Sequence, residues 1–506
     1  MVKIRVQRVQ NETTDLLLEA EAGANLLALL RENGFAVTAP CGGNGKCGKC
    51  LVRLSDASGT REVLACRTRV ESDCTVTLTE AQGGTILAGD GDLSPAAGLH
   101  GLGAAVDLGT TTVALELFEL ESGKSRGLRA AWNAQRPYGA DVITRAQYCM
   151  EHADGAETLQ GVIRGQIRDL LAEFGTVPEA LSSLVVAGNT IMQHLFVGLD
   201  PSPIALAPFT PRTLFDGEQA GPLFLSPCVA GYVGGDITAG LLAAGLDEKP
   251  GLSLFLDIGT NGEMALGGAD GFLCCAVASG PAFEGAGIAC GMAGTNGAVS
   301  HVRWTGERPE YDVIGGGAAR GLCGSGLIDL AAALCEKHII DASGLLLGPE
   351  DAPEEYAAFL GEDENGNGIF YLTEDRGVYL TAKDVRQLQL AKAAVAAGIR
   401  VLLKKSGVGL SEIGTLYLAG GFGNYMDVQS AAAIGMIPAE LVEKTVPVGN
   451  ASLAGARMAL LDPALRARLR QIQKACRYLE LSGDRDFNEE YPEQMFFYEE
   501  DVDIWN

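Results

Sequence analysis

The chain reads AAVDLGTTTVALEL from Ala104 to Leu117 and SLFLDIGTNGEMAL from Ser253 to Leu266. In both stretches an apolar strand ends at an aspartate, Asp107 or Asp257, and a Gly-Thr turn leads into a second strand with alternating apolar residues. A long sequence element that occurs twice in this way indicates an internal duplication. The repeat therefore predicts two similar lobes, each built around a strand–turn–strand hairpin.

The chemistry of the two turns suits nucleotide phosphates. A tight glycine turn exposes backbone N–H groups and threonine hydroxyls to phosphate oxygens, and an aspartate at the strand end can hold Mg2+ through water. One such hairpin is usually only a β-turn, whereas a matched pair can clamp a triphosphate from both sides. The candidate phosphate-binding residues are Gly109, Thr110, Thr111, Thr112, Gly259, Thr260, Asn261 and Gly262.

A third element, LYLAGGFGN, runs from Leu416 to Asn424. Its apolar strand leads into Gly420, Gly421, Phe422 and Gly423, where glycines leave room for the backbone to lie flat against a nucleoside. In this order the three elements resemble those of the superfamily of acetate kinases, sugar kinases, heat-shock chaperones and actin. The resemblance implies a two-lobed actin-like ATPase domain with a duplicated RNase H-like fold, which we expect in residues 104–482.

Two segments of mainly small residues, 233–246 and 450–457, resemble the connecting helices of that superfamily, which act as hinges when the lobes close on nucleotide. Four carboxylates are candidates by position for a catalytic role in ATP hydrolysis: Asp107, Asp236, Asp257 and Glu263. The alternative for each is water-bridged Mg2+ binding or a hydrogen bond at a strand end.

Other segments of the ATPase region allow simpler interpretations. The Gly-rich segments 278–287 and 321–329 either approach a ligand closely or pack helices against strands. Thr381 to Asp384 form a capping box that starts a long Ala-rich helix, which we expect to stop at Gly407. His194 is expected to be a core residue.

Cysteines near the N-terminus follow a different pattern. Cys41, Cys47 and Cys50 are spaced C-x5-C-x2-C, and Cys66 follows. Four thiolates hold a 2Fe-2S cluster, and the glycines between them let the backbone curl round it. A structural zinc site is the alternative, although zinc usually takes two separated C-x2-C pairs.

The flanks of this cysteine run predict strands around Lys3–Val9 and Thr14–Glu19 and a helix near Asn25–Arg31. The segment resembles 2Fe-2S ferredoxins with the adrenodoxin-like spacing, although the gap before Cys66 is shorter than in that group. The resemblance implies a β-grasp ferredoxin domain in residues 1–80. The fold class is thus α/β and α+β in several domains.

Two segments join or end these domains. Residues 81–103 are rich in Gly, Ala and Ser, which predicts a mobile linker or a loop on the surface. Residues 483–506 mix acidic and aromatic side chains, so we expect them to dock on the ATPase domain.

The composition limits the partners. The 506 residues carry a net charge of -26, from 64 acidic and 38 basic side chains. Such a surface repels nucleic-acid phosphates and anionic lipids, so neither is an expected partner. Neither a signal sequence nor a membrane span is apparent, and the odd number of cysteines, 13, favours a reducing compartment. We expect a cytoplasmic protein.

The combination of a 2Fe-2S domain with an actin-like ATPase resembles the reductive activators of corrinoid proteins. Beyond the cluster cysteines, the resemblance rests on LACRT at 64–68, YGADVI at 138–143, GNTIM at 188–192, DIGTNGE at 257–263, GSG at 324–326 and GGFG at 420–423. The short gap before Cys66 also fits this family. Longer members carry an extra domain between cluster and ATPase, whereas here only a short linker is expected.

The resemblance implies an ATP-dependent, single-electron reduction of cobalt(II) to cobalt(I) on a corrinoid protein of a methyltransferase system. The implied cofactors are a 2Fe-2S cluster, ATP and Mg2+. A cellular reductase or ferredoxin is the implied electron donor, and the resemblance allows a homodimer.

Two other classes of function are compatible with the residues themselves. In a redox-sensing chaperone or maturation protein the ATPase lobes would bind a partner and the cluster would report redox state. A small-molecule kinase with an appended ferredoxin would turn over ATP with a metabolite, independently of the cluster. A sensor would reduce no cobalt, and the sequence does not decide among the three.

Overall fold

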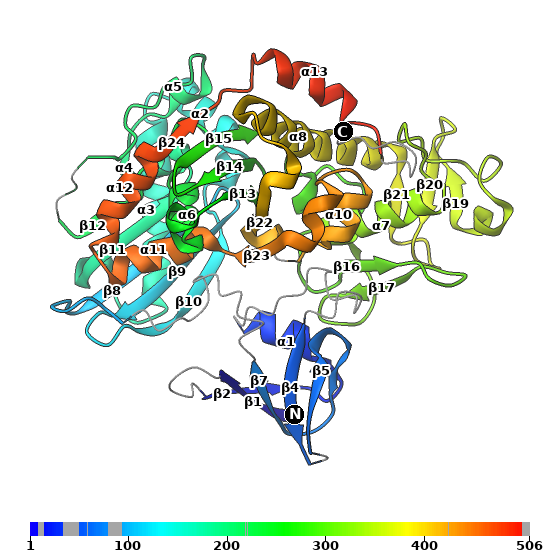
Figure 1. Ribbon diagram of the computed structural model, residues 1–506, viewed down its shortest axis with the longest axis horizontal. Helices are drawn as coiled ribbons and strands as arrows, with labels where there is room; N and C mark the ends of the chain where they lie inside the picture. Colours follow the sequence, from blue (N-terminus) through cyan, green and yellow to red (C-terminus); the bar gives the residue numbers. More distant parts are fainter. Residues whose placement is uncertain are drawn as a thin grey trace.

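The computed structural model describes residues 1–8, 15–33, 50–57, 59–78, 94–217, 219, 221–423 and 425–497 (Figure 1). Three sequence-based predictions fall partly outside these residues. They are the cluster ligands Cys41 and Cys47, most of the linker 81–103, and the end of the C-terminal segment.

The N-terminal part of the chain forms a five-stranded sheet in the order β2-β1-β7-β4-β5, in which only β1 and β7 are parallel neighbours. Its elements are β1 (Val2–Arg8), β2 (Asp15–Ala20), α1 (Leu26–Glu32), β4 (Leu51–Asp56), β5 (Gly59–Leu64) and β7 (Cys74–Leu78), with the short pair β3 (Ala24–Asn25) and β6 (Arg69–Val70). Leu26 and Leu30 of α1 pack with Ile4 and Val76 of the sheet. A mixed sheet crossed by one helix is the predicted β-grasp fold.

The first lobe is a five-stranded sheet in the order β10-β9-β8-β11-β12. Its strands are β8 (Leu102–Leu108), β9 (Thr112–Glu119), β10 (Lys124–Trp132), β11 (Leu181–Gly188) and β12 (Leu223–Leu225). The first three strands are antiparallel, and β11 is parallel to both β8 and β12. Its helices are η3 (Arg136–Tyr138), α2 (Val142–Glu151), α3 (Gly155–Ala172), η4 (Pro178–Ala180), α4 (Thr190–Val197) and α5 (Ser202–Ala205).

The second lobe repeats this order as β15-β14-β13-β22-β23, with β24 added beside β15. The strands are β13 (Leu252–Ile258), β14 (Gly262–Gly268), β15 (Gly271–Val277), β22 (Ile413–Ala419), β23 (Thr445–Gly449) and β24 (Cys476–Tyr478). Again the first three strands are antiparallel and the fourth is parallel to the first. The predicted duplication is therefore confirmed by strand order and direction.

Helices of small residues lie between the two sheets (Figure 1). They are α6 (Gly235–Ala244) and α11 (Ala451–Leu461). In the chain, η5 (Leu246–Glu248) follows α6, and α12 (Leu465–Ala475) follows α11. One core joins Val185 of the first sheet and Phe255 of the second to these helices. The helices meet closely, because a Cβ on Gly455 would lie 2.1 Å from the carbonyl oxygen of Ala239. Only small side chains permit that approach.

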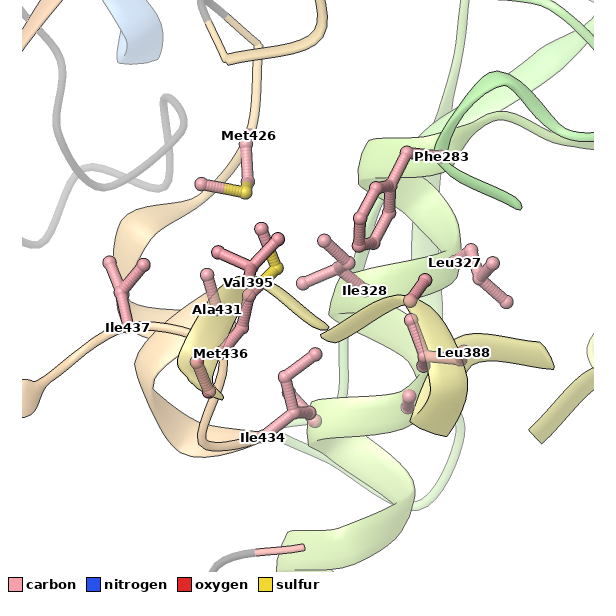
Figure 2. Close-up of a cluster of buried hydrophobic side chains, with 14 of the residues drawn as sticks. Phe283, Leu327, Ile328, Leu388, Val395, Met426, Ala431, Ile434, Met436 and Ile437 are labelled. Carbon is pink, nitrogen blue, oxygen red and sulfur yellow. The ribbon is translucent and has the colours of Figure 1, made fainter. Parts of the chain in front are cut away.

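A large insertion separates β15 from β22. It contains η6 (Pro281–Glu284), β16 (Ala298–Arg303), β17 (Glu310–Val313), β18 (Gly321–Leu322), α7 (Gly324–Glu336), η7 (Glu354–Phe359), β19 (Leu360–Glu362), β20 (Gly368–Tyr371), β21 (Tyr379–Thr381), α8 (Ala382–Ser406) and η8 (Leu410–Glu412). After β22 follow α9 (Gly420–Gly423), α10 (Val428–Ala433) and η9 (Ala439–Lys444). Side chains of α7, α8 and α10 form one apolar cluster with Phe283 (Figure 2).

The boundaries of α8 match their prediction. The Thr381 hydroxyl accepts a hydrogen bond from the Asp384 N–H, and the Asp384 carboxylate accepts one from the Thr381 N–H. At the other end Gly407 adopts φ 69°, a left-handed cap that glycine favours. Local capping residues therefore set both ends of this helix.

The chain end described by the structure packs on α8. Helix α13 (Arg485–Glu493) places Glu490 2.7 Å from Arg400, and Asp486 2.6 Å from both Lys404 and Lys405. Within the described ranges, no helix has both the length and the apolar composition that crossing a lipid bilayer requires.

Candidate active site

Four carboxylates converge where the first strands of the two lobes end. Asp107 and Asp257 occupy equivalent positions near the ends of β8 and β13. Glu263 of β14 is paired with Asp257 across the hairpin, and Asp236 lies in the first turn of α6. The structure therefore brings together all four carboxylates that the sequence singled out.

Burial and mutual repulsion change the acidity of these groups. The pKa of Asp257 is raised to about 8, first by desolvation and then by the charges of Asp236 and Asp107. The pKa of Asp236 is raised to about 7 by desolvation and by Asp107. Desolvation likewise raises the pKa of Glu263 well above its usual range. Such a cluster favours either protons or a cation that neutralises it.

Asp107 is also tied to the second connecting helix. Its two carboxylate oxygens accept 2.8 Å hydrogen bonds from the Asn450 amide and the Ser452 hydroxyl at the start of α11. These bonds oppose the rise in the pKa of Asp107 that burial causes. The first hairpin is therefore linked to a helix that packs between the lobes.

Asn133 and Arg145 hold the backbone of the first turn through hydrogen bonds. The Asn133 amide donates to the Gly109 carbonyl oxygen at 2.8 Å, and the Arg145 guanidinium donates to the Thr110 carbonyl oxygen at 2.6 Å. The backbone N–H of Asn133 also donates to the Thr111 carbonyl oxygen at 2.9 Å. All three carbonyl groups of the turn are thus fixed in direction.

Arg145 is completely buried, and desolvation lowers its pKa to about 10, so it stays charged at neutral pH. It belongs to α2, whose N-cap is Asp141 of the YGADVI motif. A second guanidinium hydrogen bond reaches the Gly139 carbonyl oxygen at 3.0 Å. The charge of Arg145 therefore lies directly behind the predicted phosphate-binding turn.

The two hairpins face each other through their threonines. The hydroxyl oxygens of Thr111 and Thr260 are 3.3 Å apart. Both hydroxyls donate to the carboxylate of Glu284, Thr111 at 2.9 Å and Thr260 at 2.8 Å. The Asn189 amide donates to the Thr110 hydroxyl oxygen at 2.9 Å. These hydroxyl and amide groups can equally bind phosphate oxygens.

The glycine motif after β22 reaches the same place. Gly420 has φ 89°, and a Cβ there would lie 2.6 Å from an Asp257 carboxylate oxygen. Gly421 faces open space, since a Cβ there would meet no atom within 4 Å. Phe422 stacks on Phe283 with ring centroids 5.1 Å apart. The motif thus lies beside the second hairpin with one backbone face open, as nucleoside binding requires.

A separate site lies in the N-terminal domain. The sulfur atoms of Cys50 and Cys66 are 3.2 Å apart, and Cys50 is buried. The Asn25 amide donates to the Cys66 carbonyl oxygen at 2.7 Å, which fixes the turn η1 (Ala65–Arg67) against α1. Two thiols so close together fit shared ligation of a small iron–sulfur group. Cys41 and Cys47 lie outside the described residues.

Known family models match the parts of the chain that carry these two sites. Residues 9–71 match the 2Fe-2S iron-sulfur cluster binding domain, residues 102–249 match the RACo middle region, and residues 251–506 match the C-terminal domain of RACo, described as the ASKHA domain. The chain belongs to the RACo family of reductive activators of corrinoid proteins. The RACo middle region corresponds to the first lobe and α6, and the ASKHA domain to the second lobe, α11 and the C-terminal helices.

Individual relatives agree with the family. The chain is 34% identical over 78% of its length to the corrinoid activation enzyme RamQ of Eubacterium limosum, of which it covers 70%. It is 26% identical over 77% of its length to a Co(II) methylated amine-specific corrinoid protein reductase of Methanosarcina barkeri, of which it covers 76%. A solved reductive activator for corrinoid, iron-sulfur protein is 31% identical, with a TM-score of 0.71 and 98% of both chains covered. This RACo family member is thus an enzyme with an ASKHA ATPase domain.

Thr112, a predicted site residue of this RACo family member, lies at the edge of the site, and other residues with reactive side chains lie away from it. Thr112 is exposed and already begins β9. His194 is buried and hydrogen bonded to the Thr190 carbonyl oxygen at 2.7 Å, as expected for a core residue. Cys274 and Cys275 are buried in β15 with raised thiol pKa values, so they remain unreactive thiols.

Sequence reasoning missed the polar residues that support the site: Asn133, Arg145, Asn189, Glu284, Asn450 and Ser452. Some of them carried a signal. Glu284 lies within the Gly-rich segment 278–287, for which ligand approach and simple packing were both open. No sequence pattern marked Asn133, because this residue follows β10 and its role depends on the turn between β8 and β9.

Proposed function

We propose that this RACo family member uses ATP to drive the single-electron reduction of cob(II)alamin to cob(I)alamin on a corrinoid protein of a methyltransferase system. The observation that carries the proposal is the match along 98% of the chain to a solved corrinoid activator, which includes both the cluster domain and the two-hairpin site. The two named relatives, which act on corrinoid proteins, support it.

The one-electron chemistry and its free-energy cost explain why a cluster domain and an ATPase domain are joined. A bound 2Fe-2S cluster supplies one electron at a time, and cobalt(II) needs one electron to become cobalt(I). Each 100 mV of unfavourable potential costs about 2.3 kcal/mol for that electron. Nucleotide binding that favours one state of the complex can offset several such steps. We propose a reductase or a ferredoxin as the electron donor.

Within the ATPase domain, the described residues have separate roles. The Thr110, Thr111 and Thr260 hydroxyls donate to phosphate oxygens, and Arg145 and Asn133 keep the first turn in position. The open backbone face at Gly421 receives the nucleoside. Because α6 and α11 pack between the two sheets, a change in the distance between the hairpins is transmitted to both helices.

Mg2+ fits the carboxylate cluster. Within the part of the chain that the structure describes, no three His, Cys, Asp or Glu side chains come close enough together to hold a metal ion directly. Asp107, Asp236, Asp257 and Glu263 would therefore hold Mg2+ partly through water or through the nucleotide. A cation held there would offset the mutual repulsion that helps to raise the pKa values of Asp236, Asp257 and Glu263, and it would neutralise phosphate charge.

The test is an anaerobic assay with the complete protein. Its cluster is reduced, a cob(II)alamin-loaded methyltransferase component is added, and the cobalt(I) absorbance is followed with and without Mg-ATP. We expect cobalt(I) only when ATP is present. Asp257→Asn should abolish the ATP effect and leave the cluster spectrum unchanged, whereas Cys50→Ala should remove the cluster and leave ATP binding intact.

Other results would assign the chain to another class. ATP turnover that depends on a metabolite and not on the cluster would indicate a kinase. No cobalt(I) with several corrinoid proteins, despite an intact cluster and bound ATP, would indicate a sensor or a chaperone. Size-exclusion chromatography with light scattering, with and without ATP, would test whether the active form is a homodimer.

A further inference from the structure

Glu284 places a negative charge between the two predicted phosphate-binding turns. One of its carboxylate oxygens accepts hydrogen bonds from Thr111 at 3.1 Å and from Thr260 at 2.8 Å, and the other accepts from Thr111 at 2.9 Å. Thr111 belongs to the first lobe and Thr260 to the second. A single carboxylate therefore bridges the two lobes at the point where their hairpins meet.

The position of Glu284 is set by a rigid turn. Its neighbours Ala282 and Phe283 are buried, and Phe283 points into the apolar cluster of α7, α8 and α10 (Figure 2). The turn η6 is closed by hydrogen bonds from the Gly285 N–H to the Ala282 carbonyl oxygen and from the Ala286 N–H to the Pro281 carbonyl oxygen. The side chain of Glu284 extends towards the hairpins, where it meets the Thr111 and Thr260 hydroxyls.

The same hydroxyl groups cannot serve two anions at once. A carboxylate and a phosphoryl group both accept hydrogen bonds from hydroxyls, and both are negatively charged. Two such groups on the same pair of donors repel each other at short range. Glu284 and a nucleotide phosphate are therefore competitors for Thr111 and Thr260.

We propose that Glu284 acts as an internal phosphate mimic, which holds Thr111 and Thr260 in the nucleotide-free chain and is displaced by a phosphate group of ATP. This inference rests on the proposed binding of ATP between the hairpins. Displacement moves the side chain of a residue whose neighbour Phe283 stacks on Phe422 of the nucleoside motif. The turn η6 thereby connects phosphate binding to the nucleoside side of the site.

The experiment measures the affinity of the complete protein for a non-hydrolysable ATP analogue and for pyrophosphate by titration calorimetry. Glu284→Ala removes the competing anion, and Glu284→Gln keeps the shape of the side chain without its charge. Both variants should bind the two ligands more tightly, by about tenfold for one like-charge contact. Glu307→Gln, an exposed carboxylate of the same insertion, should leave both affinities unchanged.

The outcomes separate this inference from the proposed function. If the wild-type protein binds the analogue and Glu284→Ala binds it equally or more weakly, the phosphate-mimic role is wrong and the proposed function stands. Unchanged affinity with a loss of turnover of a hundredfold or more would show that Glu284 acts in hydrolysis instead, which also overturns the inference. If neither protein binds the analogue or pyrophosphate, both proposals fail. Thermal melting of Glu284→Gln checks that the fold is preserved.

Discussion

The hydroxyl oxygens of Thr111 and Thr260 lie 3.3 Å apart, although the two residues are separated by 149 positions in the chain. Each lies in the turn after the first strand of its lobe, Thr111 four residues after Asp107 and Thr260 three residues after Asp257. The two turns thus bring one threonine hydroxyl from each lobe close together. This pair defines where a phosphate group can be held from both sides.

Removing one of these hydroxyls should weaken ATP binding. Thr111→Val and Thr260→Val keep the branched shape and delete one donor to the phosphates, so we expect each to raise the Kd for an ATP analogue about tenfold, the loss expected for a hydrogen bond to a charged group. Titration calorimetry measures this effect. Thr305→Val, at an exposed position, is the control. Equal affinities for all three variants and the wild type would contradict the proposed position of the phosphates.

The support behind the first turn can be tested at Arg145. Arg145→Met removes the donors to the half-buried Thr110 and Gly139 carbonyl oxygens, and the loss of these hydrogen bonds costs about 1 kcal/mol in the free energy of unfolding. We expect weaker ATP binding as well, with partial recovery in Arg145→Lys, which restores the charge. Urea unfolding and calorimetry report the two effects separately.

Two outcomes would limit the role of Arg145. The exposed Arg168→Met serves as the control, since it removes the same group from α3. A loss of stability without any loss of ATP affinity would show that Arg145 is purely structural. No change in either quantity would mean that the turn does not depend on it.

A pH dependence is expected where the C-terminal segment packs on α8. Lys392 is buried, donates to the Phe496 carbonyl oxygen and lies over the Phe497 ring, and burial lowers its pKa from 10.5 to about 7. The neighbouring Cys335 remains a neutral thiol, because burial raises its pKa to about 12. Between pH 7 and pH 10.5 the Lys392 amine is mostly protonated in the unfolded chain and mostly neutral in the folded chain. Stability should therefore rise with pH in this range.

The variant Lys392→Met isolates this contribution. The difference in unfolding free energy between wild type and variant should change by roughly 3 kcal/mol between pH 7 and pH 10, in favour of the wild type at high pH. Urea unfolding at several pH values measures it. Lys383→Met, at an exposed position of the same helix, should show no such trend. A parallel pH profile for both variants would show that Lys392 does not titrate in this range.

The cluster site allows a comparison between two cysteines of one domain. Cys50 lies 3.2 Å from Cys66, whereas Cys74 is buried in β7 as part of the core. We expect Cys50→Ala to lose the visible absorbance and the electron paramagnetic resonance signal of a reduced 2Fe-2S cluster. Cys74→Ala should keep both signals and lose only a little stability. A zinc content in place of iron, measured by metal analysis, would refute the cluster.

How far each part of the molecule could be predicted depended on the range of its contacts. The strands β1 and β2, and the ends of α8 at Thr381 and Gly407, follow from patterns and caps within a few residues. The short strand β24 could not be predicted, because three residues carry no period and join the sheet only by pairing with β15. The edge of the second sheet therefore became visible only in the structure.

The sequence by itself determined the duplication, the two Gly-Thr turns, the glycine motif and the cysteine spacing, because each is a local pattern with its own physical meaning. The tertiary structure alone decided that Glu284 bridges Thr260 and Thr111, across separations of 24 and 173 positions, and that Asn450 and Ser452 hold Asp107, across 343 and 345 positions. A local pattern limits only the backbone near it. Which polar side chains meet is set by how the sheets and helices pack, and that packing depends on the whole chain at once.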